Sequence, residues 1–84
     1  MLNIQFSKKA KKFLTKCEEE TFNRIKQRLS ELANKPNSSD SKKVEGRKEK
    51  VFRIRVGEYR ILYVIFEESK ELFISEIDKR GRIY

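Results

Sequence analysis

The stretch VFRIRVGEYRILYVIF, residues 51–66, predicts a tight β-hairpin. In its first arm three apolar residues alternate with Arg53 and Arg55. Successive side chains of a strand point to opposite faces, so one face is apolar and the other carries two guanidiniums about 7 Å apart. Gly57-Glu58 supplies the turn, because glycine tolerates a positive φ.

The return arm, Tyr59–Phe66, brings a third arginine, Arg60, back towards Arg53 and Arg55. We expect the three on one face if the register allows it. Cations gathered on a sheet face repel one another, which favours an anionic ligand as the reason for them. The structural alternative is the solvated outer face of a half-buried sheet, which is common. The pattern by itself leaves both interpretations open.

Size and charge limit what this chain can do. Its 84 residues predict one domain, residues 1–84, with one modest core. Lys and Arg total 21 against 13 Asp and Glu, a net charge of +8. That imbalance favours a nucleic acid, an acidic protein partner, or both.

The cysteine and histidine content limits which disulfides and metal sites the chain can form. Cys17 is the single cysteine and the chain has no His, so neither an internal disulfide nor a zinc site is expected. We expect no metal and no cofactor. The longest apolar run, Ile61–Phe66, is too short to span a membrane, and no signal-peptide core follows Met1. We therefore expect a cytoplasmic protein.

The N-terminal half predicts one strand and two helices. Leu2–Phe6 alternates as a strand, and Ser7 is positioned to cap a helix over residues 8–17. Residues 18–21 predict a break before a second helix over 21–34. The apolar stripes of the two helices are Ala10, Phe13, Leu14 and Cys17, then Phe22, Ile25, Leu29 and Leu32. We expect these stripes to cover the sheet, the alternative being a partner-binding face.

The C-terminal half predicts loops and strands around the hairpin. The predicted segments are a loop at 35–41, a polar cationic stretch at 42–50, a turn at 67–70, a strand at 71–77 and a basic tail at 78–84. The order β-α-α-β-β-β indicates an α+β fold. We expect a two-helix hairpin on one face of a small, mainly antiparallel sheet, with the other face open.

Positive charge is concentrated around the hairpin. Residues 42–60 hold eight Lys or Arg and three Asp or Glu, and the tail 78–84 adds three further cations. Concentrated cations bind phosphate strongly. Arginine adds a bidentate fork for phosphate oxygens and a flat face for stacking on bases.

Two motifs carry a family resemblance: VFRIRVGEYRILY at 51–63 and DKRGRIY at 78–84. With the element order, they make the whole chain resemble the RelE toxins of the RelE/ParE superfamily. The resemblance implies a ribosome-dependent mRNA endonuclease, or mRNA interferase, that cleaves mRNA in the ribosomal A site. It also implies a cognate RelB-type antitoxin that holds the toxin inactive, expected to be acidic and partly disordered.

The resemblance assigns roles to residues of both motifs. The catalytic positions it implies are Arg53, Arg55, Arg60, Arg80 and Tyr84. The cations expected to bind RNA or the ribosome are Lys42, Lys43, Arg47, Lys48, Lys50, Lys79 and Arg82. The chain departs from the family at Glu45, where relatives often have a basic residue, and its tail after Arg80 is shorter than in some members.

Cleavage by attack of a ribose 2′-OH needs a base, cations for the phosphorane charge, and an acid for the leaving 5′-oxygen. Arginine does not deprotonate in proteins, so the arginines are charge stabilisers and substrate clamps. The base is Tyr84, a lysine such as Lys50 or Lys79, or a group on the ribosome. Tyr84 could instead stack on a base, or be a frayed terminal residue.

Two other functions remain open from the sequence. One is a ParE-like toxin that binds and inhibits DNA gyrase without cutting nucleic acid. The other is a nucleic-acid-binding module with no enzymatic activity. A shared fold does not discriminate between them, and the sequence does not determine codon preference or how the antitoxin neutralises the toxin.

Overall fold

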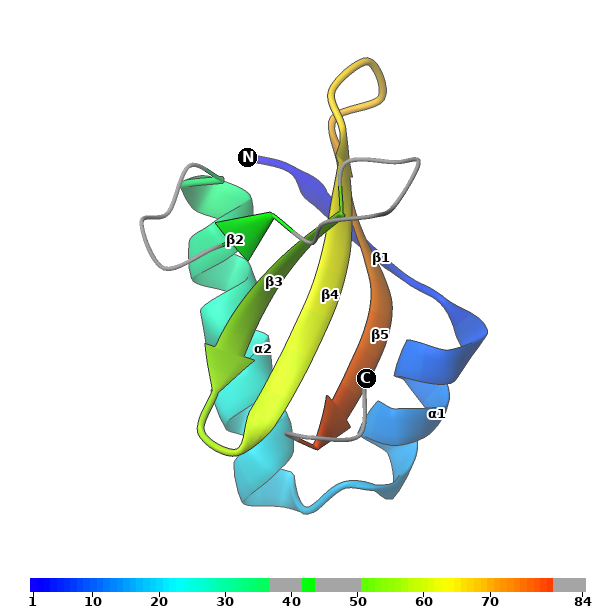
Figure 1. The fold of residues 1–84 in the computed structure, drawn as a ribbon, viewed down its shortest axis with the longest axis vertical. Helices are drawn as coiled ribbons and strands as arrows, with labels where there is room; N and C mark the ends of the chain where they lie inside the picture. The colour runs from blue at the N-terminus through cyan, green and yellow to red at the C-terminus, as the bar shows by residue number, and fades with distance from the viewer. Residues whose placement is uncertain (37–41, 44–50, 80–84) are drawn as a thin grey trace.

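The computed structural model describes residues 1–36, 42–43 and 51–79, and it has the predicted α+β architecture (Figure 1). The elements in chain order are β1 (Asn3–Phe6), α1 (Lys8–Lys16), α2 (Glu19–Asn34), β2 (Lys42–Lys43), β3 (Val51–Val56), β4 (Tyr59–Phe66) and β5 (Glu71–Lys79). The predicted order β-α-α-β-β-β is confirmed, with the short strand β2 in addition.

The strands form one five-stranded sheet in the order β1-β5-β4-β3-β2. Only β1 and β5 pair in parallel, so the sheet is mainly antiparallel, as predicted. Strand β2 pairs Lys42 and Lys43 with Arg53 and Phe52. The predicted order did not include this strand, which forms because the free edge of β3 offers backbone groups to pair with.

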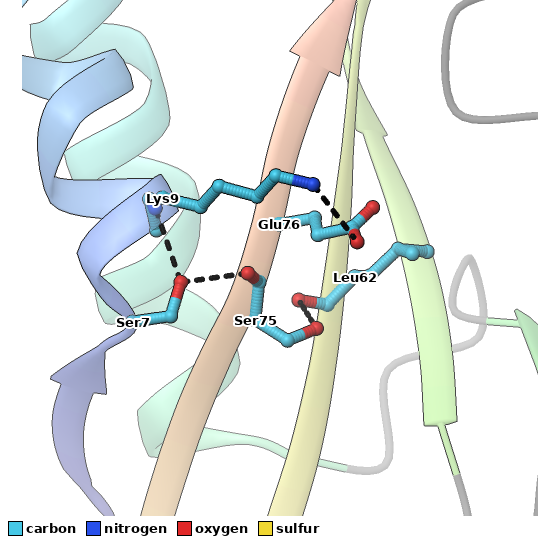
Figure 2. A network of polar contacts seen from close by, with 6 residues as sticks. Ser7, Lys9, Leu62, Ser75 and Glu76 are labelled. Atoms are coloured by element: carbon cyan, nitrogen blue, oxygen red, sulfur yellow. Dashed lines mark hydrogen bonds and ion pairs between the residues drawn. The ribbon is translucent and has the colours of Figure 1, made fainter.

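Ser7 caps α1 as predicted. Its Oγ accepts a hydrogen bond from the Ala10 amide at 3.1 Å and donates one to the Ser75 carbonyl at 2.7 Å, which ties the helix start to β5 (Figure 2). Helix α2 begins at Glu19, so the predicted break at 18–21 is wrong beyond Glu18. Two glutamates in its first turn favour this earlier start through the helix dipole. Within the described residues, neither helix is long and apolar enough to cross a membrane.

Both helices pack on one face of the sheet, here called the first face. A single buried cluster joins Ala10 of α1 and Ile25 of α2 to sheet residues such as Ile54, Ile61 and Leu72. Figure 1 shows α2 behind the sheet, running antiparallel to α1. The predicted helical hairpin on one sheet face is confirmed, and the opposite, second face points towards the viewer in Figure 1.

Strand β5 extends to Lys79, so the prediction that a tail begins at Asp78 is wrong. The start of β4 supplies the partners for this extension. Leu62 pairs with Glu76 and Tyr63 with Ile74, which leaves Ser75 as a bulged residue. Such an extra residue shifts the alternation of side chains beyond it. Glu76 and Asp78 consequently lie on the second face.

Candidate nucleic-acid interface

The β3–β4 hairpin turns within two residues, Gly57 and Glu58, as predicted. Val56 and Tyr59 are the last paired residues, and Gly57 has φ +59°. A two-residue turn with glycine at its first central position matches the twist of the strands it joins. This turn sets the register of the whole hairpin and thereby decides which arginines share a face.

Three arginines of the hairpin lie on the second face and form what we call the guanidinium cluster: Arg53, Arg55 and Arg60. Arg55 is the Cα partner of Arg60, and Arg53 is the partner of Leu62. The register therefore places all three arginines on one face, as the sequence analysis expected it could. Arg55 is exposed, Arg53 is half-buried and Arg60 is only 6% exposed.

Arg60 is the only charged residue that is buried among the residues the structure describes. Its Nε and Nη1 atoms are enclosed. The strand register places Arg55 on one side of it and Asp78 on the other. Taking a charge out of water is costly, so the burial of this guanidinium between Arg55 and Asp78 needs a physical reason.

The second face carries a small group of apolar side chains beside the arginines. Val51, Leu62 and Val64 form a small buried cluster there, and Leu62 is 2% exposed. They lie on the same face of the same two strands as the arginines, and Leu62 is the register partner of Arg53. The arginines therefore stand beside buried apolar side chains on this face. An apolar border lowers the local dielectric, and charges beside it interact more strongly than they do in water.

Strand β5 brings three acidic residues onto this face, Glu71, Glu76 and Asp78, and Glu71 lies at the far end of the sheet, opposite Phe66. Asp78 is the register partner of Arg60, and its Oδ1 accepts a hydrogen bond from the Lys79 amide at 2.7 Å. Glu76 lies 3.8 Å from the Lys9 ammonium, across the edge of β5 (Figure 2). Glu76 is thus engaged by a cation from α1, which leaves Asp78 as the carboxylate beside the three guanidiniums.

The other predicted contact residues divide into three groups. Lys42 is the Cα partner of Arg53, so β2 runs alongside the cluster. Lys79 is the partner of Tyr59, on the first face, and its Nζ lies 3.8 Å from Glu58 Oε2. The residues that fall outside the described part of the chain are Arg47, Lys48, Lys50, Arg80, Arg82 and Tyr84.

Sequence reasoning missed Asp78 and Arg24. Asp78 was assigned to a tail, although the apolar positions of β5 shift from even to odd numbers before it, which is the signature of a bulge. Arg24 of α2 lies against the hairpin turn, since a Cβ built on Gly57 would be 3.1 Å from its Nη2. No local pattern connects two residues so far apart in the chain.

Comparison with known families gives one match over nearly the whole chain. Residues 4–84 match the family described as ParE toxin of type II toxin-antitoxin system, parDE. A protein of Methanocaldococcus jannaschii named "Putative toxin RelE1" is 26% identical over 85 residues, covering 98% of this chain and 93% of that protein.

Two solved complexes share the fold. The RelB-RelE antitoxin-toxin complex from Methanococcus jannaschii contains a chain that is 29% identical, with a TM-score of 0.74, covering 95% of this chain and 94% of that one. The archaeal RelE-RelB complex from Pyrococcus horikoshii contains one that is 25% identical, with a TM-score of 0.79, covering 96% and 97%.

Proposed function

The chain belongs to the RelE/ParE superfamily of toxins from type II toxin–antitoxin systems, and from this membership we propose that it is a ribosome-dependent mRNA endonuclease. The observation that carries the proposal is the guanidinium cluster, with Arg60 buried between Arg55 and Asp78. Three like charges on one face are costly without an anion to bind, and a scissile phosphate is such an anion.

In the proposed reaction a ribose 2′-OH gives its proton to a base and its oxygen attacks the neighbouring phosphorus, so that negative charge develops on the phosphorane oxygens. The bond from phosphorus to the 5′-oxygen then breaks and that oxygen takes a proton from an acid, which leaves a 2′,3′-cyclic phosphate and a 5′-OH. Arg60 and Arg55 stabilise that charge, since preorganised cations act most strongly where charge appears in the transition state. Arg53 grips an adjacent phosphate through its planar fork. Arg80 is proposed to join them as a fourth cation.

The proton transfers are assigned to groups other than arginine. Arginine stays protonated in proteins, so none of the cluster residues is the base. Of the candidates, Lys79 is the least suited, because it lies on the first face and beside Glu58. Tyr84, Lys50 or a group on the ribosome takes the proton from the 2′-OH, and Tyr84 is alternatively a stacking platform for the base.

The proposed partners are mRNA in the ribosomal A site and a RelB-type antitoxin. The related toxins of Methanococcus jannaschii and Pyrococcus horikoshii are found in complex with RelB. A net charge of +8 complements an acidic chain, and disordered acidic segments can fold onto such a surface. Activity on translating ribosomes places the toxin in the cytoplasm.

Primer extension on programmed ribosomes tests the proposal. The wild-type chain is expected to cut mRNA in the A site and to leave the same RNA intact when it is free. The double variant Arg60→Ala/Arg80→Ala is expected to lose cleavage, whereas Lys11→Gln, a charge change on α1, retains it. Translation arrest of wild-type strength in the double variant would refute the proposal.

Inhibition of DNA gyrase is the second candidate, and it is favoured by the name of the matched family, ParE. A supercoiling assay with purified gyrase separates the two. DNA cleavage complexes without any cut on programmed ribosomes would establish the gyrase function instead. RNA binding with no product in either assay would indicate a binding module without enzymatic activity.

A further inference from the structure

A groove lies between the C-terminal half of α1 and the start of β4, on the first-face side of the sheet. Its volume is about 440 Å³, within the usual range of ligand sites. The residues that line it are Lys9, Lys12, Phe13, Lys16, Cys17, Glu18 and Tyr59. The function proposed above makes no use of it.

Three lysines stand along this groove at the spacing of one helix face. Lys9, Lys12 and Lys16 are all exposed and lie within two turns of α1. Lys9 is 3.8 Å from Glu76. In the described part of the chain neither Lys12 nor Lys16 has an ion-pair partner. With Glu18 as the single acidic lining residue, the groove is cationic.

Two aromatic rings form the apolar part of the groove. Phe13 and Tyr59 meet edge to face, with ring centroids 5.4 Å apart and planes at 70°. Both side chains are half-buried, so parts of the rings remain accessible. Aromatic faces flanked by cations are the common design for holding single-stranded nucleic acid, because bases stack on the rings while lysines contact phosphates.

We propose that this groove is a second RNA-binding site, which holds a single-stranded segment of the substrate RNA. It deepens the function proposed above by anchoring RNA away from the guanidinium cluster. Tyr59 and Arg60 are consecutive in β4, so they point to opposite faces at the same end of the sheet. Figure 1 shows the C-terminal end of α1 at this end of the molecule.

An acidic protein segment is the competing occupant. Carboxylates would satisfy Lys12 and Lys16 equally well, but they have no aromatic face to stack on Phe13 or Tyr59. The pairing of cations with two rings therefore favours RNA.

Salt dependence of binding tests the site without requiring cleavage. The probe is a 2′-O-methyl oligoribonucleotide, which lacks the attacking hydroxyl. On a single strand, log K falls as log salt rises, and each lost phosphate contact reduces the magnitude of this negative slope by about 0.7. The variant Lys12→Gln/Lys16→Gln should therefore bind more weakly, and the magnitude of its salt slope should be smaller by about 1.4. The matched control, Lys8→Gln/Lys11→Gln, removes the same charge from residues of α1 that do not line the groove.

Cys17 provides an independent readout, because it lines the groove and is the only cysteine in the chain. Saturating oligonucleotide should slow its alkylation by a maleimide several-fold in the wild type and in the control, and leave it unchanged in Lys12→Gln/Lys16→Gln. A further variant, Tyr59→Leu, should bind roughly tenfold more weakly with an unchanged salt slope, since it removes stacking and no charge.

Equal slopes in the two lysine variants, or no protection of Cys17, would overturn the second site. So would a groove variant that loses affinity for an acidic peptide and not for the oligonucleotide, since the occupant would then be a protein. None of these outcomes depends on cleavage, so the cleavage assay on ribosomes tests the proposed endonuclease function independently of the second site.

Discussion

Arg55 and Arg60 lie directly opposite each other in the β3–β4 ladder. Like charges at directly opposed positions of an antiparallel pair destabilise the sheet. The chain keeps this pair next to a turn whose geometry leaves no other register, and it buries one of the two guanidiniums. We propose that this pair, which costs stability, serves to bind an anion.

Replacing Arg55 by Gln should separate stability from function. We expect the free energy of unfolding to stay the same or rise by about 0.5 kcal/mol, because a repulsive cross-strand pair is removed. Cleavage on programmed ribosomes should fall by about a hundredfold, since one stabiliser of the phosphorane charge is lost. Urea unfolding and single-turnover primer extension measure the two effects, with Lys11→Gln as the matched loss of one charge. A marked loss of stability together with unchanged cleavage would contradict this interpretation of the pair.

Replacing Arg60 by Lys keeps the charge but removes the planar fork. We expect the variant to fold and to cleave at least tenfold more slowly, because a lysine contacts phosphate as a point charge. Arg60→Ala should in addition lower the free energy of unfolding by about 2 kcal/mol, since it empties a buried position next to Asp78. Thermal unfolding and cleavage are measured on both variants. Full activity of Arg60→Lys would show that Arg60 supplies only charge.

Replacing Gly57 by Ala should destabilise the hairpin by about 1 kcal/mol, because φ is +59° there and L-residues disfavour that region. The new Cβ would also approach Arg24 Nη2 at 3.1 Å, but a guanidinium at the end of a flexible side chain can move. We therefore expect the same loss in an Arg24→Ala background, measured by urea unfolding. A loss that disappears in that background would assign the cost to the contact instead of the backbone. Gly57→Asn should be tolerated better, since Asn is enriched at positive φ.

Replacing Ser7 tests the connection between α1 and β5. Ser7→Ala removes both the helix cap and the bond to the Ser75 carbonyl, and we expect a loss of about 2 kcal/mol. Ser7→Asp can still accept from the Ala10 amide but cannot donate to Ser75, so its loss should be about half as large. Chemical unfolding measures both. Equal stability of the two variants would mean that only one of the two bonds contributes.

Local patterns were sufficient for most of the fold. The alternation in β3, the glycine at the turn and the apolar stripes of the helices predicted the hairpin and the two helices that cover it. The errors lie at the start of α2, at β2 and at the end of β5, and in the last two a short segment becomes a strand because a neighbouring strand offers partners. Such pairing depends on residues distant in the chain, and no local propensity reports it.

By itself the sequence determined the element types, the family, and the placing of Arg53 and Arg55 on one strand face, because these follow from side-chain period and from contiguous motifs. Only the tertiary structure decided that Arg60 is buried, that Asp78 stands beside it and that three lysines meet two aromatic rings in a groove. Each of these depends on a register or on packing between separate elements. The bulge at Ser75 shows why, since one extra residue there turns Glu76 and Asp78 onto the face of the arginines.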